Sequence, residues 1–269
     1  MTSSPAADFH SHLMPGVDDG AADLAEAVEG VEAMARDGVR TLITTPHFDG
    51  SLTKNTAAAA LRLAALDAAW DALMADAAVS ATGVRLMRGV ELLLDVPDPD
   101  LTDPRLRLNG TRFVLVEYPA MQLPPMHADF AVRMLRDQGW QPVIAHPERY
   151  RNVDDTLVEL ATLRMAGAYF QVNAGSLVGA YGESVARRAW ALLTRGWAEF
   201  GSSDYHARGL PTVAAARTML AERGGAAVGD LLFSENPARL ADNNSPLPVP
   251  PLPAGSGGVR RLLKKWFGA

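Results

Sequence analysis

The chain has 269 residues, 48% of them hydrophobic, and it contains no cysteine. This length suits a single α/β barrel, and the lack of cysteine excludes disulfides, thiolate metal sites and phosphatases that use a cysteine nucleophile. The formal net charge is −6, and the last eleven residues hold four basic and no acidic side chains, so the rest of the chain carries −10; such an acidic body argues against nucleic-acid binding.

Short apolar and β-branched runs alternate with longer helical patterns along the chain, which is typical of successive βα units around a parallel sheet. Seven runs predict strands: residues 7–10, 40–45, 84–92, 112–117, 142–145, 168–172 and 197–202. Helices are predicted at 22–37, 55–78, 126–138, 154–166, 182–194, 211–222 and 225–232. We therefore expect an α/β barrel over residues 1–240, with its chemistry at the C-terminal ends of the strands.

The composition changes near residue 241, where a Pro-, Gly- and Ser-rich segment begins. We interpret residues 241–258 as a flexible linker. Residues 259–269 place apolar side chains on one face and four basic ones on the other, which predicts a basic amphipathic helix. Such a helix suits an anionic membrane surface or a partner protein, although a frayed, solubilising tail fits the pattern equally well.

The sequence predicts neither a membrane span nor a signal peptide. No apolar run approaches the roughly 18 residues of a span, and residues 1–8 lack a basic start and an apolar core. We therefore expect a cytoplasmic protein, peripheral at the inner face of the membrane if the tail binds there.

Histidines gather at the ends of the predicted strands. His10, His12, His47 and His146 lie at or just beyond strand ends, His206 follows the last strand, and His127 lies near the start of a helix. Residues two apart in a strand point to the same side, so His10 and His12 can hold one metal ion. A lone His-x-His motif fits two core or solvated histidines equally well, but ligand-type residues at several independent strand ends favour a metal site.

Carboxylates accompany these histidines. Glu91 and Glu117 follow strongly apolar strands, where an acid is costly unless it is paired or bound to metal, and Asp204 follows the last strand. In Asp18-Asp19-Gly20, at least one aspartate fits a turn or a helix N-cap. Nitrogen and oxygen ligands without sulfur suit manganese, iron or zinc.

Two arginines are candidates for binding phosphate. Arg149 lies three residues after His146, and a guanidinium can hold two phosphate oxygens at once, although a surface ion pair is the alternative. Arg208 is a weaker second candidate.

We interpret residues 173–176 as a strand-to-loop turn.

These motifs resemble the polymerase-and-histidinol-phosphatase (PHP) superfamily, and more closely its CpsB-type protein-tyrosine phosphatases of bacterial capsule and exopolysaccharide loci. The resemblance covers about residues 7–240. Its specific parts are the Asp-Asp-Gly element at 18–20 and the His-Pro-Glu-Arg-Tyr element at 146–150. Weaker parts are the segments at 8–13, 45–47, 89–91, 171–173 and 203–206.

The resemblance implies a distorted seven-stranded TIM-like barrel, (β/α)7, with three metal ions, often manganese. One ion would bind His10, His12, Glu91 and Asp204; Glu91 would bridge to a second ion held by His47 and His146; Asp19, Glu117 and His206 would hold the third. Metal-bound hydroxide would hydrolyse phosphotyrosine on a cognate, membrane-bound tyrosine kinase that controls polysaccharide export. Arg149 matches the phosphate-binding arginine of the family. Arg208 lies in a loop that is shorter than the family pattern. His206 or His127 could protonate the leaving group.

Other functions remain open from sequence alone. The protein could hydrolyse a small phosphorylated metabolite such as histidinol phosphate, act as an exonuclease-like phosphodiesterase, or bind metal as a regulator without turnover. A carbamylated-lysine amidohydrolase is excluded because the only lysines, Lys54, Lys264 and Lys265, lie away from strand ends. The sequence leaves the native metal, the target protein and the oligomeric state undetermined.

Overall fold

The computed structural model describes residues 4–124 and 128–253. Each of the seven predicted runs contains a strand. The run at 84–92 is interrupted and holds two strands, and one strand that was not predicted follows the run at 40–45 beyond Pro46, which has no N–H to donate to a neighbouring strand. The strands are β1 (Ala6–Asp8), β2 (Val39–Thr44), β3 (His47–Asp49), β4 (Arg85–Arg88), β5 (Glu91–Leu93), β6 (Phe113–Glu117), β7 (Gln141–Ala145), β8 (Tyr169–Asn173) and β9 (Phe200–Ser202).

The strands form two sheets in which every pair is parallel. One has the order β1-β2-β4 and the other the order β3-β5-β6-β7-β8-β9. A backbone hydrogen bond joins them just beyond β1 and β9, from the Asp204 N–H to the His10 carbonyl (2.8 Å). The fold is therefore mixed α/β, but the described residues form two adjoining sheets instead of the single closed barrel that we expected.

Helices appear in all seven predicted regions. They are α1 (Leu24–Arg36), α2 (Thr56–Ala75), α3 (Ala77–Ala81), α4 (Ala128–Asp137), α5 (Val158–Met165), α7 (Glu183–Thr194), α8 (Val213–Glu222) and α9 (Ala226–Asp230), with a π-helix at Leu231–Glu235. Side chains cap the first two, because Asp23 accepts a hydrogen bond from the Glu26 N–H and Asn55 from the Ala58 N–H.

Several short helices were not predicted. The expected turn after β8 is the helix α6 (Ala174–Leu177), which Asn173 caps by accepting from the Gly175 N–H. The helix α10 (Asn236–Ala241) begins with a proline in its first turn, where a missing N–H costs no hydrogen bond. Short 3-10 helices lie at Gly50–Lys54, Pro104–Leu106, Leu108–Gly110, Pro119–Met121 and Pro147–Arg149.

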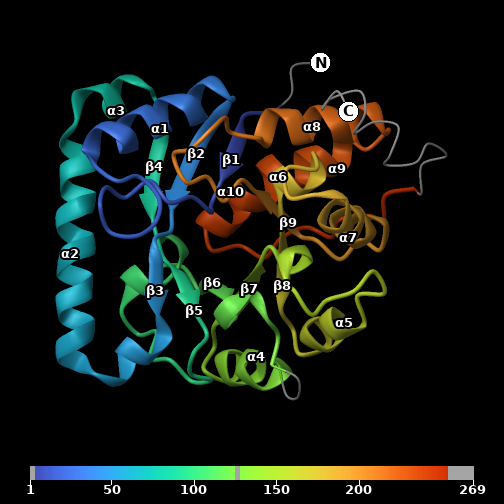
Figure 1. Cartoon of the computed structure of the whole chain (residues 1–269), viewed down its shortest axis with the longest axis horizontal. Helices are drawn as coiled ribbons and strands as arrows, with labels where there is room; N and C mark the ends of the chain where they lie inside the picture. The colour runs from blue at the N-terminus through green and yellow to red at the C-terminus, as the bar shows by residue number, and fades with distance from the viewer. Residues whose placement is uncertain (1–3, 125–127, 254–269) are drawn as a thin grey trace.

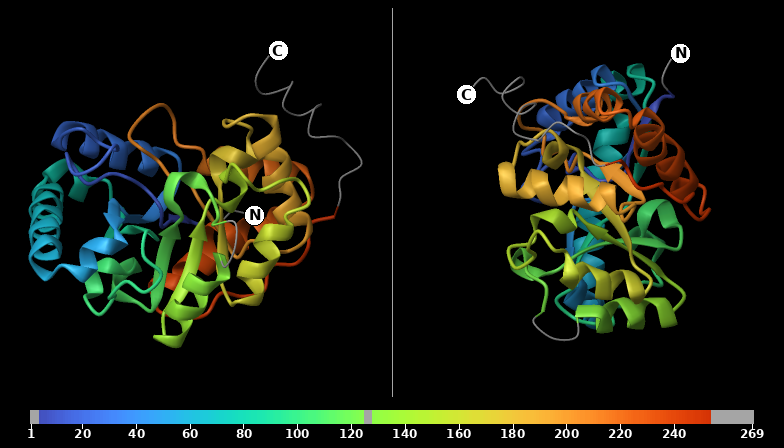
Figure 2. Two further views of the ribbon diagram at one scale, coloured as in Figure 1. Left: turned by 60° about the horizontal axis from the view of Figure 1, so that its bottom comes forward. Right: turned by 90° about the vertical axis from the view of Figure 1, so that its right-hand side faces the viewer.

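Apolar side chains fill the space between the strands. Phe9, Phe113 and Phe200 belong to one buried cluster, which also includes Leu240 of α10, and the rings of Phe9 and Phe200 meet edge to face at 5.3 Å. Two larger clusters pack the helices onto the outside of the strands. Helices α1 to α3 lie on one side of the molecule and α7 to α9 on another (Figures 1 and 2). This packing fixes the strand ends that carry the candidate ligands.

Residues 242–253 include the first part of the predicted linker. They form no regular secondary structure, but Val249 and Leu252 are buried in the core, and the Leu252 N–H donates to the Leu193 carbonyl (2.9 Å). This stretch is therefore packed against the domain. The rest of the predicted linker and the predicted helix at 259–269 lie outside the described residues, in which no helix is both long and apolar enough to cross a membrane.

Candidate metal centre

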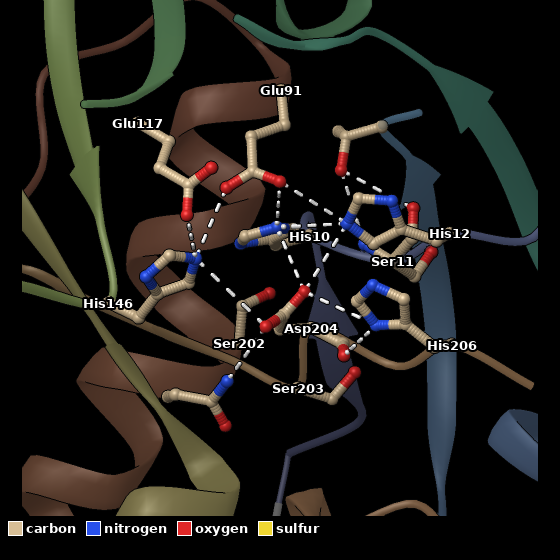
Figure 3. A network of polar contacts seen from close by, with 12 residues as sticks. His10, Ser11, His12, Glu91, Glu117, His146, Ser202, Ser203, Asp204 and His206 are labelled. Atoms are coloured by element: carbon tan, nitrogen blue, oxygen red, sulfur yellow. Dashed lines mark hydrogen bonds and ion pairs between the residues drawn. The ribbon is translucent and has the colours of Figure 1, made fainter. Parts of the chain in front are cut away.

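The nine predicted metal ligands come together at the C-terminal ends of the strands. Figure 3 shows seven of them: His10, His12, Glu91, Glu117, His146, Asp204 and His206. Glu117 ends β6, while His47 and Glu91 begin β3 and β5, the continuations of two interrupted strands. The other ligands follow a strand directly or lie in the loop beyond it: His10, His12 and Asp19 after β1, His146 after β7, and Asp204 and His206 after β9. The topology thus places residues up to 196 positions apart in one site.

The inner group comprises His10, His12, Glu91 and Asp204, whose ligand atoms all lie within 4.8 Å of one another. The Nε2 atom of His10 lies 3.2 Å from both Glu91 Oε2 and Asp204 Oδ1, and that of His12 lies 3.3 Å from the same two oxygens. All four side chains are buried. These are the four residues that we predicted to share one ion.

A second group comprises His12, Asp19, His47 and His206, and a third comprises His47, Glu91 and Glu117. This grouping differs from the sets that the family resemblance implied. Asp19 lies beside His47 and His206, at 3.5 and 3.4 Å, and Glu117 lies beside His146 (3.8 Å) instead of beside Asp19. The His146 Nε2 atom also lies 3.2 Å from Glu91 Oε1, so Glu91 contacts several of the candidate ligands.

Buried side chains orient the first two histidines. The Nδ1 atom of His10 lies 3.0 Å from Gln171 Oε1, and that of His12 lies 2.8 Å from Asp18 Oδ2. With Nδ1 engaged in this way, Nε2 of each ring faces the inner group, which is the arrangement that second-shell partners give to metal-binding histidines. Sequence reasoning did not predict these contacts. It interpreted at least one aspartate of Asp18-Asp19-Gly20 as a turn or cap residue and used Gln171 only as part of a motif, because only the fold brings the two side chains to the histidines.

Gly20 explains the glycine of the Asp-Asp-Gly element. A Cβ atom at this position would lie 2.0 Å from the His12 carbonyl oxygen. The chain returns so closely here that the Ala21 N–H donates to that same carbonyl (3.0 Å). Only glycine permits this approach, which brings Asp18 and Asp19 back to the histidines.

Burial and neighbouring charges shift the pKa values of the inner group and of the nearby Glu117. Burial opposes protonation of His10, but the nearby Glu91 and Asp204 carboxylates outweigh it and raise the pKa of His10 to about 9. Burial would also raise the pKa of Glu91, yet His10 and its neighbours hold it well below the usual range. Burial, together with the negative charge of Glu91, raises the pKa of Glu117 to about 8. Such closely packed acids and histidines are typical of functional sites.

Arg149 lies at the edge of this group. Its guanidinium forms an ion pair with Asp204 and lies over the ring of Tyr181, 4.4 Å from the ring centre. Arg149 belongs to the 3-10 helix that follows His146. The backbone of His146 itself is left-handed (φ 32°). A left-handed backbone is unfavourable for a residue with a Cβ atom and is concentrated at functional sites. Sequence reasoning did not identify Tyr181, which lies 32 positions farther along the chain.

The remaining two candidates are placed differently. Arg208 is on the surface, and its Nη2 atom donates to the main-chain carbonyl of Asp19 (2.6 Å). It therefore supports the loop that carries Asp19. His127 lies outside the described residues.

The donor set fits divalent transition metals. Imidazole nitrogens and carboxylate oxygens converge, the inner carboxylates are withdrawn from water, and the two inner histidines are fixed in orientation. Buried carboxylates and histidines packed this closely are costly unless a cation neutralises them. Manganese, iron and zinc all suit such nitrogen and oxygen ligands.

Comparison with known proteins identifies the family. The family model for capsular polysaccharide synthesis proteins of the CpsB/CapC type matches residues 6–242. The chain belongs to the CpsB/CapC family. This confirms the resemblance seen in the sequence motifs.

Its relatives include proteins named as tyrosine-protein phosphatases. The tyrosine-protein phosphatase YwqE of Bacillus subtilis is 33% identical over 201 residues, which is 74% of this chain and 76% of that protein. The tyrosine-protein phosphatase CpsB of Streptococcus pneumoniae is 27% identical over 242 residues, 87% of this chain and 97% of that one. A crystal structure from a study of these two proteins, described as unique metal-dependent tyrosine phosphatases, superimposes with a TM-score of 0.73 at 30% identity and covers 92% of this chain and 99% of that one.

Proposed function

We propose that this protein is a metal-dependent protein-tyrosine phosphatase. The observation that carries the proposal is the buried inner group, in which two histidines and two carboxylates present their ligand atoms to a common centre. The names of the relatives supply the substrate class, since YwqE and CpsB are tyrosine-protein phosphatases. We further propose that the two adjoining sheets act together as a distorted seven-stranded barrel.

The three groups of ligand atoms support up to three manganese ions, with iron or zinc as alternatives. His10, His12, Glu91 and Asp204 would hold the inner ion, and Asp19, His47 and His206 would hold an outer one together with His12. Glu117 and His146 would complete a third site beside Glu91. Bound ions would supply positive charge that activates water and neutralises phosphoryl oxygens.

Side chains of the protein would bind the phosphate and support the leaving group. Arg149, at the edge of the inner group, would bind two phosphate oxygens, and the ring of Tyr181 beneath it would keep its guanidinium in place. Tyrosine is an acceptable leaving group because the pKa of its hydroxyl is about 10, so proton donation by the protein matters less than for an alkyl phosphate. The ring of His206 lies beside Asp19, which supports its role as a ligand more than as an acid.

A direct assay tests this function. Purified protein should hydrolyse para-nitrophenyl phosphate and a phosphotyrosine peptide when Mn²⁺ is added, and a chelator should abolish both activities. A preference for histidinol phosphate over the peptide would instead support the metabolite phosphatase. Absence of turnover with every substrate and metal would contradict the enzyme assignment and favour a metal-binding regulator.

We also propose that the substrate is a membrane-bound tyrosine kinase of a capsule or exopolysaccharide system, and that the phosphatase acts at the cytoplasmic face of the membrane. The basic residues of the 259–269 segment suit an anionic membrane surface. Because Val249 and Leu252 are packed into the core, a test truncation belongs after Gly258. Sedimentation with anionic liposomes should be lower for the truncated protein, and equal sedimentation would exclude the membrane role.

A further inference from the structure

Arg62 occupies a position that the proposed chemistry does not explain. It lies on α2, outside the ligand groups, and its side chain is partly buried. Its Nη1 atom donates to the Val17 carbonyl (2.8 Å) and its Nη2 atom to the His47 carbonyl (2.7 Å). One side chain thus connects the loop that carries Asp19 to the strand that carries His47.

The backbone of His47 needs such a partner. β3 is the edge strand of its sheet, because it pairs only with β5. The N–H and C=O of His47 are met by side chains: Asp18 accepts from the N–H (3.1 Å) and Arg62 donates to the C=O. The two side chains fill the place that a neighbouring strand would take, and they leave neither backbone group unpaired.

The outer ligands depend on this connection because the core does not fix them. The side chains of Asp19 and His47 are 64% and 38% exposed, whereas that of His12 is fully buried. The Asp19 and His47 side chains, together with Arg62, line an open pocket of about 420 Å³, so they face solvent on that side. A planar guanidinium with two donors in a fixed fork can set the spacing between two carbonyls, which a lysine cannot do.

We propose that Arg62 is a positioning residue that sets the distance between Asp19 and His47 and thereby determines how tightly the outer ion is held. This inference rests on the proposed function, since it assumes that the outer group binds a metal ion. Both hydrogen bonds that Arg62 donates among the described residues go to main-chain carbonyls, so its effect is transmitted through the backbone. Loss of such an orienting partner typically weakens metal binding about 10- to 100-fold.

The test compares Arg62→Ala, Arg62→Lys and Asp67→Ala with the unaltered protein. Asp67 is the matched control. It lies on the same helix as Arg62 and forms ion pairs with Arg88 (2.7 Å) and Arg105 (2.6 Å), away from the outer ligands. Mn²⁺ per chain is measured by elemental analysis, and the dissociation constant of the weakest ion by competition with a chelator. We expect about 10- to 100-fold weaker binding of that ion in Arg62→Ala, an intermediate loss in Arg62→Lys, and none in Asp67→Ala.

Two results would overturn the inference. One is Arg62→Ala with the metal content and affinity of the unaltered protein, and the other is an equal loss in Asp67→Ala, which would assign the effect to the placement of α2 as a whole. If Arg62→Ala does not fold, Arg62→Lys decides, and unchanged affinity there counts against the role. Failure of the unaltered protein to bind any Mn²⁺ would be a separate result, which contradicts the proposed function itself.

Discussion

The inner and outer halves of the metal centre are built differently. The inner ligands His10, His12, Glu91 and Asp204 are at most 6% exposed and extend directly from strands or their ends. In the outer half, the side chains of Asp19, His47 and His206 are 64%, 38% and 25% exposed. The inner half is thus fixed by the sheets, while the outer half depends on hydrogen bonds that Arg62 and Arg208 donate to main-chain carbonyls and on one that Asp18 accepts from the His47 N–H.

This difference predicts unequal consequences of mutation. When an inner ligand is removed, water cannot reach the site to replace it, and buried charges are left without a partner. Its loss should therefore strongly weaken metal binding. An exposed outer ligand can be replaced in part by water. Substitution of an inner ligand should therefore abolish most of the activity, whereas substitution of an outer ligand should reduce it only in part.

The largest effect is expected for Glu91→Gln, which leaves the shape of the side chain but removes its charge. Glu91 is buried and contacts His10, His12 and His146. We expect phosphotyrosine hydrolysis to fall by about 1,000-fold or more, or roughly 4 kcal/mol of transition-state stabilisation. Steady-state kinetics with saturating Mn²⁺ would measure it, with exposed Glu222→Gln as the control. Activity within tenfold of the unaltered protein would contradict the bridging role of Glu91.

The inner half could be predicted from the sequence because its ligands follow strand patterns. His10, Glu91 and Asp204 lie next to short apolar runs, and parallel strands place such positions on one face. The strands themselves were predicted for the same reason. We expected a single closed barrel, but the described strands form two sheets. Pro46, which has no N–H to donate, separates β2 from β3, and periodicity does not register such a break.

The outer half could be predicted only as a set of residue types. Nothing near His47 in the sequence indicates that Asp19 is its neighbour, or that Glu117 lies beside His146 instead. Arg62 is one of several arginines on helices, and only the docking of α2 brings it to two carbonyls. Contacts between distant loops depend on tertiary packing, which leaves no periodic signal in the sequence.

The next largest effect is expected for Arg149→Ala. Arg149 is paired with the inner ligand Asp204, whereas Arg208 supports the outer loop. We expect Arg149→Ala to lower kcat/KM about 100-fold, as for the loss of one charge-stabilising donor, and Arg208→Ala to lower it about tenfold or less. Inhibition by inorganic phosphate should weaken mainly in Arg149→Ala. Equal losses in the two variants would show that the loop arginine also binds phosphate.

A smaller effect is expected for Asp19→Asn in the outer half. Because Asp19 is mostly exposed, water can take part of its place, so we expect about a tenfold loss of kcat/KM and weaker binding of one ion. Elemental analysis at limiting Mn²⁺ would detect the missing ion. A loss as large as that of Glu91→Gln would remove the distinction between the two halves.

The smallest effect is expected beneath the inner half, at Glu199. Burial raises the pKa of this carboxyl although Arg164 opposes the shift, and its Oε2 atom accepts from the Phe170 N–H (3.0 Å), which ties β8 to the start of β9. A raised pKa means that the folded state binds the proton more tightly than the unfolded state. The resulting stability is fully present below the ordinary carboxyl value of 4.5 and is lost as the pH rises through the raised value.

Glu199→Gln cannot titrate, so the melting temperature of metal-free protein should fall less between pH 4.5 and neutrality than it does in the unaltered chain. For a chain of this size, each kcal/mol of that difference corresponds to about 2 to 4 °C in melting temperature. Scanning calorimetry at several pH values would measure the slope, and Glu222→Gln should keep the slope of the unaltered protein. Because Glu199 lies below the ligands, Mn²⁺ binding should not change; a loss of the inner ion in Glu199→Gln would mean that the strands do not fix the inner half independently.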